Sequence, residues 1–385
     1  MMTTRWGAVF ALWFAGLCGA AQFAKIGLVF EELKPLWPDA GAGLGLMVSI
    51  VGFMGILFGS TAGLFVARLG PRRTIVTALL VAGVLSLVQS VGLPLGWMLA
   101  TRVAEGLCHL AIVVVGPVLI AANCAPKDQA AGMTLWSSFF AVAFTVIALL
   151  GLPLVYQHGV ALLWQCHAGA CLLAGGLLWK VLPVGQTLRA SGRVGFVQLL
   201  RDHVAIYASP YTAAPATGFI FYTFIFVAIM TLVPAQIPSG HRAFVASAMP
   251  LFSIAASMGI GVQLMRVMAA VRVVQLGFAI AATGAVLWFF ATGLWGIAAA
   301  LMMAAALGLV QSASFAAIPQ LNAEAQDRAR AAGAIAQLGN IGTTLGTPVL
   351  LLVTQAYGSH GISYFVLPLC IGGIAMHSFQ SARRP

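Results

Sequence analysis

Long apolar runs, almost free of charge, recur along this sequence and constrain its fold more than any other feature. A helix that crosses a bilayer needs about 20 mostly apolar residues, because it rises about 1.5 Å per residue through a hydrocarbon core about 30 Å thick. The sequence contains twelve such runs, which predict an all-α polytopic membrane protein with twelve transmembrane helices. The expected spans are Trp6–Val29, Leu44–Val66, Thr74–Gly92, Trp97–Ala121, Gly132–Val155, Val160–Leu182, Ala213–Val233, Phe244–Met265, Val271–Phe290, Leu294–Ile318, Ala331–Thr354 and Ile362–Phe379.

The composition excludes a soluble protein. Only 7% of the 385 residues are charged and 61% are hydrophobic, against about 25% and about 45–50% in ordinary soluble domains. This leaves too little polar surface for a water-soluble enzyme. The first apolar run also exceeds the stretch of about 7–15 residues in a cleaved signal peptide, so we expect it to be retained as a helix.

The positions of the basic residues predict the orientation in the membrane. Of 19 Lys and Arg residues, 15 fall in segments expected on one side, and only Lys34 and Arg242 fall on the other; Lys25 and Arg102 lie inside spans. Cytoplasmic loops carry such an excess. We therefore expect a protein of the plasma (inner) membrane with both termini in the cytoplasm. The net charge of +11 is then an orientation signal, and we expect no nucleic-acid partner.

The longest connection between spans divides the chain into two halves. We expect residues 1–183 to form an N-terminal six-helix bundle, residues 184–212 a cytoplasmic central loop, and residues 213–385 a C-terminal six-helix bundle. Apolar residues at helical spacing between Phe196 and Tyr207 predict an amphipathic helix on the membrane surface. A plain solvated linker is the alternative.

The two halves repeat a pattern at nearly one offset. Asn123 and Asp128, after the fourth span, match Asn322 and Asp327, after the tenth span, 199 residues later. A Gly and an Arg five residues apart also follow both the second and the eighth span. These matches support a duplicated six-span unit.

The segment between the second and third spans carries a motif. It reads Gly63-Leu-Phe-Val-Ala67-Arg68-Leu-Gly70-Pro71-Arg72-Arg73, and the fourth span contains Arg102-Val-Ala-Glu105-Gly106. These segments resemble the loop G-x-L-a-D-R-x-G-R-R/K and the pattern R-x-x-q-G of the major facilitator superfamily. Ala67 replaces the aspartate of the loop, and Pro71 stands where the family has arginine.

The resemblance implies two six-helix pseudo-repeats and a secondary transporter that works by alternating access. It also implies that Gly63, Arg68, Gly70, Arg72 and Arg73 form a gating loop that latches the cytoplasmic side. Glycine permits a tight turn, and arginine can cap carbonyls at helix C-termini or pair with acids on neighbouring helices. A purely topogenic basic loop is the alternative, because Ala67 removes the charged form of the latch.

Three charged residues, Lys25, Arg102 and Glu105, lie well inside spans rather than at their ends, and such residues are functional candidates because burial of a charge in a bilayer is costly. In the fourth span Arg102, Glu105 and His109 share one helix face. They form either a structural ion pair or a site in which Arg102 binds an anionic group and Glu105 or His109 exchanges a proton. Lys25, one turn from Gln22, either snorkels outward to Glu31 or Glu32 or adds a second cation to that site.

Uncharged polar residues provide the candidates in the second half. Gln311 in the tenth span, and Gln337 and Asn340 in the eleventh, either bind substrate or join helices by hydrogen bonds. His167 in the sixth span is interpreted as a packing residue. A stripe of Gly339, Gly342 and Gly346 is typical of a close-packed helix face rather than of a ligand site.

These observations favour a secondary transporter of a small organic or inorganic anion, coupled to protons. If Lys25 snorkels, proton-driven export of amphipathic compounds is the alternative. A membrane-embedded enzyme or channel is disfavoured, because the sequence lacks both G-x-x-x-x-G-K-[ST] and H-E-x-x-H. We expect a monomer in the lipid bilayer, with a small-molecule substrate and without catalytic residues, cofactor or metal.

Overall fold

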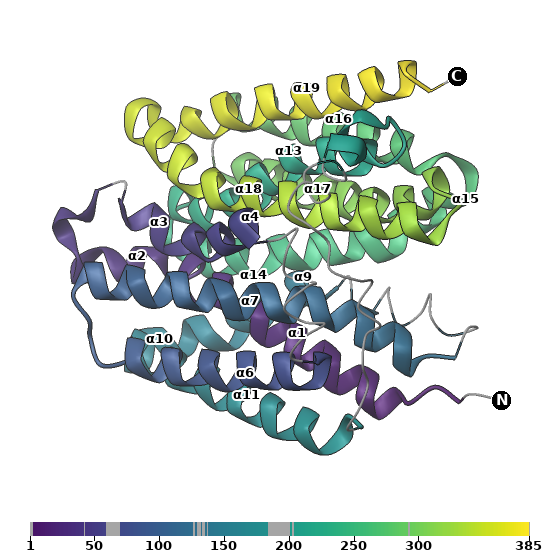
Figure 1. Ribbon diagram of the computed structural model, residues 1–385. Helices are drawn as coiled ribbons and strands as arrows, with labels where there is room; N and C mark the ends of the chain where they lie inside the picture. Colours follow the sequence, from purple (N-terminus) through teal and green to yellow (C-terminus); the bar gives the residue numbers. More distant parts are fainter. Residues whose placement is uncertain are drawn as a thin grey trace. The chain divides into compact units, whose positions relative to one another are not determined.

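The computed structural model describes residues 3–41, 43–58, 70–125, 128, 132, 135–136, 138–183, 201, 204–291 and 293–384. Throughout these ranges the regular elements are helices, which Figure 1 shows in chain order. The long helices are α1 (Trp6–Gly27), α6 (Pro71–Gln89), α7 (Leu95–Asn123), α11 (Val160–Val181), α13 (Ala213–Leu232), α16 (Ala270–Phe290), α17 (Leu294–Leu321), α18 (Ala325–Tyr357) and α19 (Gly361–Ala382). Short helical turns are α2 (Phe30–Leu33), η1 (Lys34–Leu36), η2 (Pro38–Ala40), η6 (Pro234–Gln236) and η8 (Gly358–His360).

Three of the expected spans are interrupted helices. The second consists of α3 (Gly43–Ser49), the 3₁₀ turn η3 (Ile50–Gly52) and α4 (Phe53–Phe58); its expected remainder lies outside the described residues. The fifth consists of α9 (Phe139–Val146), the π-helical η5 (Ile147–Gly151) and α10 (Leu152–His158). The eighth consists of α14 (Ser239–Ala255), the π-helical η7 (Ala256–Gly261) and α15 (Val262–Val267).

The structure confirms the fold class. Ten helical segments in the described residues are long and apolar enough to cross a membrane; one of them, Arg330–Ala382, contains most of α18 and all of α19. Gly43–Phe58 is a shorter apolar helix at the place of the second span. Each expected span therefore corresponds to apolar helix in the structure.

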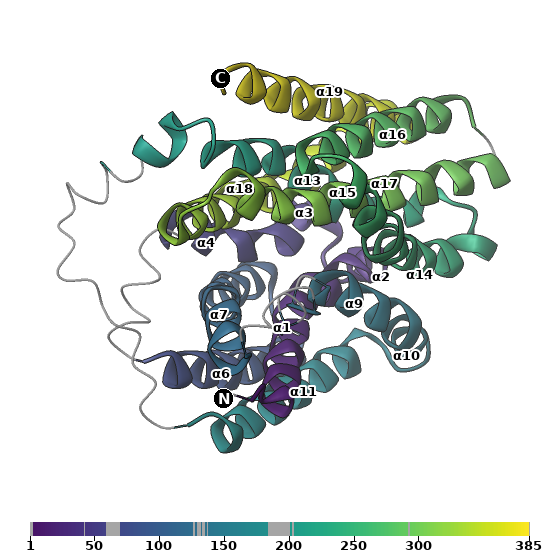
Figure 2. The ribbon, with the colours of Figure 1, turned by 90° about the vertical axis from the view of Figure 1, so that its right-hand side faces the viewer.

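The chain divides into two compact units. The first contains residues 1–41 and 50–192, and the second contains residues 42–49 and 193–385. In the first unit α1 packs against α7 and α11, and α6 packs against the same two helices, as Figure 2 also shows. Their shared core is made of aliphatic and small residues, among them Leu12, Leu79, Ile112 and Leu178.

In the second unit α18 packs closely on α13 along the predicted glycine stripe. A Cβ atom added to Gly342 would lie 2.1 Å from Thr223 Oγ1, and one added to Gly346 would lie 2.2 Å from the Phe224 carbonyl oxygen. Only glycine permits this approach of the two backbones. The stripe is therefore a packing face in the structure.

Matching asparagines tie helix ends together in both units. The Asn123 side chain donates to the Leu119 carbonyl at the end of α7, and its Oδ1 accepts from Arg5, just before α1, at 3.2 Å. Asn322 follows α17 in the same way: its amide donates to the Ile318 carbonyl and to the Tyr211 carbonyl, just before α13. The repeated asparagines thus each bond to the end of their own helix and to the segment before another helix, Asn123 as acceptor and Asn322 as donor in the second bond.

The predicted amphipathic helix lies mostly outside the described residues. Residues 204–208 are helical, with Val204 exposed and Tyr207 half-buried. The structure therefore gives only the end of this segment.

Candidate functional site

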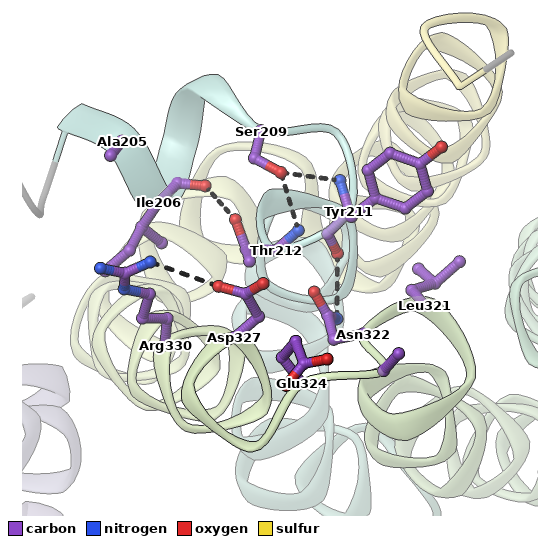
Figure 3. Close-up of a pocket in the computed structure, with 11 residues that line it drawn as sticks. Ala205, Ile206, Ser209, Tyr211, Thr212, Leu321, Asn322, Glu324, Asp327 and Arg330 are labelled. Atoms are coloured by element: carbon purple, nitrogen blue, oxygen red, sulfur yellow. Dashed lines mark hydrogen bonds and ion pairs between the residues drawn. The ribbon is translucent and has the colours of Figure 1, made fainter.

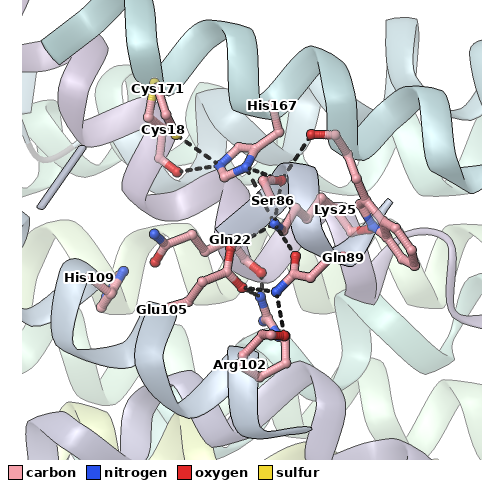
Figure 4. Close-up of polar contacts among 12 residues, drawn as sticks. Cys18, Gln22, Lys25, Ser86, Gln89, Arg102, Glu105, His109, His167 and Cys171 are labelled. Carbon is pink, nitrogen blue, oxygen red and sulfur yellow. Dashed lines mark hydrogen bonds and ion pairs between the residues drawn. The ribbon is translucent and has the colours of Figure 1, made fainter. Parts of the chain in front are cut away.

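Lys25 lies at the centre of a buried polar cluster in the first unit (Figure 4). Its ammonium group, in the last turn of α1, donates to Glu105 Oε1 and Gln89 Oε1 at 2.7 Å each and to Ser86 Oγ at 2.8 Å. It also lies 3.3 Å from His167 Nδ1. Lys25 is fully buried, and Glu31 pairs with Lys34 instead. The snorkelling alternative is thus wrong for this structure.

Glu105 joins the two buried cations. One carboxylate oxygen accepts from Lys25, and the other accepts from Arg102 and from Gln89 Nε2, the latter at 2.9 Å. The second terminal nitrogen of Arg102 donates to the Gln22 backbone carbonyl at 2.6 Å, which links α7 to α1. Arg102 and Glu105 form the ion pair that their spacing predicts, and Lys25 pairs with the same carboxylate.

Gln22 has a side chain with no visible role in this packing. Its amide is fully buried, and neither its nitrogen nor its oxygen has a hydrogen-bond partner among the described residues. A buried amide without partners costs about 1–3 kcal/mol. Gln22 lies one helical turn from Lys25, and its own backbone carbonyl holds Arg102. The Gln22 side chain, unlike its backbone carbonyl, thus makes no hydrogen bond to the described part of the cluster.

His109 shares the helix face of Arg102 and Glu105 but makes different contacts. Its Nδ1 lies 3.1 Å from the Gly19 carbonyl oxygen, and its ring packs edge-on against Phe23, with ring centroids 5.1 Å apart. Because a carbonyl only accepts, Nδ1 carries the hydrogen. His109 is thus tied to the α1 backbone rather than to the ion pair.

The structure adds three polar side chains that the sequence interpretation missed. Gln89 and Ser86 on α6 bond to Lys25, and His167 on α11, interpreted as a packing residue, contacts both Lys25 and Ser86. One signal could have revealed them. Two cations and a single carboxylate inside the spans need further acceptors, and each lone polar residue in a neighbouring apolar span is a candidate.

The charges of the cluster do not balance. Lys25, Arg102 and Glu105 have fully buried side chains, with two cations and one carboxylate. The three groups together carry one net positive charge in an apolar surrounding. A buried charge is costly unless an opposite charge and hydrogen bonds offset it. Hydrogen bonds to Gln89, Ser86 and the Gln22 backbone carbonyl offset part of this cost.

The expected residues of the second unit are not gathered into one cluster. Gln337 Oε1 accepts from the Tyr207 hydroxyl at 3.0 Å, and burial raises the pKa of Tyr207 to about 12. Asn340 donates to the Ala336 carbonyl of its own helix. Gln311 is half-buried on α17. Hydrogen bonds to Tyr207 and within α18 thus account for two of these three residues.

The motif loop is described only in part, since Gly63 and Arg68 lie outside the described residues. Gly70 has a φ of 82° just before α6, a conformation that favours glycine. The Arg72 guanidinium stacks 4.2 Å from the Trp179 ring and donates to the Trp179 carbonyl in the last turn of α11. Arg72 therefore caps a helix C-terminus, one of the two roles expected for it. Arg73 is exposed.

A cavity of about 240 Å³ lies in the second unit, where the segment before α13 meets the α17–α18 connection (Figure 3). Arg330 pairs with Asp327 at 3.3 Å within it, and Asn322 bonds to the Tyr211 carbonyl. None of the expected substrate-binding residues lines this cavity. Its lining residues are Ala205, Ile206, Ser209, Tyr211, Thr212, Leu321, Asn322, Ala323, Glu324, Asp327 and Arg330.

Comparison with known proteins identifies the family and the fold. The family model described as Major Facilitator Superfamily matches residues 9–347. A crystal structure of a bacterial homolog to the human lysosomal transporter Spinster, in an inward-facing and unoccupied conformation, aligns with a TM-score of 0.69 and 13% identity, over 97% of this chain and 94% of that chain. At this identity the likeness shows the fold alone. No curated protein matches the sequence.

Proposed function

The chain belongs to the major facilitator superfamily, a family of membrane transporters. We propose that it carries a small organic or inorganic anion across the inner membrane. Transport is by alternating access, in which two six-helix bundles, residues 1–183 and 213–385, rock about a central site. Proton movement accompanies the anion. Both termini lie in the cytoplasm, and the gating loop of Gly63, Arg68, Gly70, Arg72 and Arg73 closes that side.

The single observation that supports an anionic substrate is the charge imbalance of the buried cluster. Lys25 and Arg102 face one carboxylate, Glu105, so an added anion would make the cluster neutral. The alternative, export of amphipathic compounds, requires that Lys25 snorkel outward to the membrane surface. In the structure Lys25 is instead paired with Glu105. The anion is therefore the proposal that the geometry supports best.

We expect Arg102→Ala to reduce anion uptake by roughly 30-fold or more, because the loss of one partner of a buried, hydrogen-bonded charge pair costs about 2–5 kcal/mol. The substrate is first sought by thermal stabilisation of the purified protein with lactate, succinate and inorganic phosphate. Uptake of the stabilising anion is then measured in proteoliposomes under an inward proton gradient. The matched control is Arg272→Ala, which removes an exposed arginine at the start of α16.

Equal uptake by the Arg102→Ala and Arg272→Ala variants would show that Arg102 does not bind the transported anion. If the wild-type protein takes up none of the three anions and an amphipathic cation is expelled instead, the anion proposal is wrong.

A further inference from the structure

One end of the α6–α11 helix pair in the first unit is rich in basic side chains. The two helices lie side by side (Figure 1), and α6 begins where α11 ends, because the Arg72 guanidinium stacks on the Trp179 ring. Arg72 also donates to the Trp179 carbonyl, and Arg5 donates to the Val181 carbonyl at 2.8 Å. Arg5 and Arg72 are therefore used to cap the C-terminus of α11.

Arg73 and Lys180 have no such use. Both side chains are exposed, and neither makes a hydrogen bond or an ion pair with another residue in the part of the chain that the structure describes. Each is the neighbour in sequence of a residue in the stacked pair, so both lie at the same end of the two helices. Asp128, the acidic residue described at this end of the unit, accepts from the Thr4 hydroxyl. The two cations thus lack a counter-charge among the described residues.

The outward surface next to these cations is apolar and contains an open notch. Leu173 is 65% exposed, and Gly176 and Lys180 follow it at intervals of three and four residues, so the three share one face of α11. Nothing lies within 4 Å of a Cβ atom added to Gly176. The neighbouring Gly175 packs against Leu80 of α6, which is itself 41% exposed. A hydrocarbon chain can therefore lie over Gly176, between exposed leucines of the two helices.

Charge and shape together select the occupant of this surface. Tryptophan is enriched at the boundary between hydrocarbon and headgroups, and Trp179, 53% exposed, lies at the end of the apolar stripe. Basic side chains at this level attract anionic lipids. A phospholipid with a net negative charge matches both parts of the surface, whereas a zwitterionic one matches the apolar stripe and leaves the excess positive charge without a partner.

We propose that Arg73, Gly176, Trp179 and Lys180 form a binding site for an anionic phospholipid. The lipid phosphate accepts hydrogen bonds from Arg73 and Lys180, and one acyl chain lies over Gly176 along α11. Arg73 also belongs to the proposed gating loop, but lipid binding requires no transport. The lipid site and the proposed function can therefore fail independently of each other.

Native mass spectrometry of the full-length, delipidated protein in detergent measures the binding directly. The protein is titrated with phosphatidylglycerol and, separately, with phosphatidylcholine that has the same acyl chains. We expect phosphatidylglycerol to bind at least about tenfold more tightly, and Arg73→Gln/Lys180→Gln to remove roughly this factor, because each basic residue near the headgroups adds attraction for an anionic lipid. Equal affinities of the wild-type protein for the two lipids would overturn the proposal.

Two double variants are the controls. Arg73→Lys/Lys180→Arg keeps both charges and should bind phosphatidylglycerol as the wild-type protein does. Arg266→Gln/Arg272→Gln removes two exposed cations from the second unit and should leave the affinity unchanged. If this variant loses as much affinity as Arg73→Gln/Lys180→Gln, the lipid responds only to total charge and the proposed site is wrong.

The notch has a separate test, which leaves the charges in place. Gly176→Leu fills the open space, so it should weaken the binding of both lipids and keep the preference for phosphatidylglycerol. Unchanged binding by this variant contradicts the proposed position of the acyl chain.

Free phosphate is distinguished from a lipid by thermal unfolding of the delipidated protein. Any stabilisation by inorganic phosphate should persist in Arg73→Gln/Lys180→Gln, whereas stabilisation by phosphatidylglycerol should decrease. Loss of the effect of inorganic phosphate in this variant would mean that the two residues bind free phosphate, and it would contradict a lipid site.

Discussion

Gln89 shows how a neutral side chain holds the buried charges in place. Its carbonyl oxygen accepts from Lys25, and its amide nitrogen donates to Glu105 and to Thr101. We expect Gln89→Met, which keeps the volume but removes these bonds, to destabilise the first unit by about 2–4 kcal/mol, because hydrogen bonds to charged groups contribute about 1.5–3 kcal/mol each. Thermal unfolding in detergent measures the effect.

The matched control for this change is Gln275→Met. Gln275 bonds to Ser378 in an exposed position, so its loss should shift the unfolding temperature little. Equal shifts for the two variants would mean that Gln89 does not support the ion cluster.

At this scale the sequence predicted the charged residues of the cluster but not all of their partners. Arg102 and Glu105 are three residues apart on one helix, so their pairing follows from helix geometry. The contacts of Lys25 with Ser86 and His167 join positions 61 and 142 residues apart, and only the packing of the helices brings them together. A single polar residue in an apolar span is therefore a candidate whose partner the sequence cannot name.

At the level of helix contacts, the glycine stripe of α18 allows the close packing of α18 on α13. Gly342→Ala places a Cβ atom 2.1 Å from Thr223 Oγ1 and 2.6 Å from the Ile220 carbonyl oxygen, so α18 must move away from α13. We expect a loss of about 1–3 kcal/mol, as for other overpacked sites, and a lower unfolding temperature.

Gly333→Ala on the same helix is the control, since nothing lies within 4 Å of the added Cβ atom. Alanine is also the better helix former by about 1 kcal/mol, so this variant should be neutral or slightly more stable. If Gly342→Ala is equally harmless, the close packing of α13 and α18 is not required for stability.

Interrupted helices are an element-scale feature that the hydrophobic pattern did not predict. The fifth span has π-helical turns at Ile147–Gly151, just before Pro153, which lacks the amide hydrogen that would bond to the Leu149 carbonyl. Hydropathy counts apolar residues along a run, and it does not distinguish a regular helix from one with a widened turn. The spans were therefore predicted well, and their internal geometry was not.

At the level of the whole molecule, the hydrophobic pattern predicted the number and positions of the membrane helices but not the exact division into two units. Twelve apolar runs predicted the membrane helices. In a bilayer each spanning segment must have apolar side chains and must satisfy its own backbone hydrogen bonds, so local sequence is enough to identify it. The division into units depends instead on long-range packing: residues 42–49 belong to the second unit, although they precede most of the first unit in the chain.

The orientation in the membrane is a prediction at this scale. A fluorescent protein fused after the C-terminus should fold and fluoresce in the cytoplasm, and alkaline phosphatase fused after Gly92 should be active outside the membrane. Exchange of the two reporters is the control, and both should then be inactive. Fluorescence after Gly92 would reverse the orientation that the basic residues predict.

The single net positive charge of the Lys25–Arg102–Glu105 cluster has a consequence for the driving force. If one monovalent anion and one proton bind together, their charges cancel, and the loaded carrier has the same net charge as the empty one. The loaded and the empty step of the transport cycle then move equal charge across the membrane. The electrical potential then does no net work, and accumulation is limited to about tenfold per unit of pH gradient. A divalent anion would instead carry charge against an inside-negative potential, at about 2.3 kcal/mol per 100 mV. The presence or absence of an electrical current thus reports the valence of the transported anion.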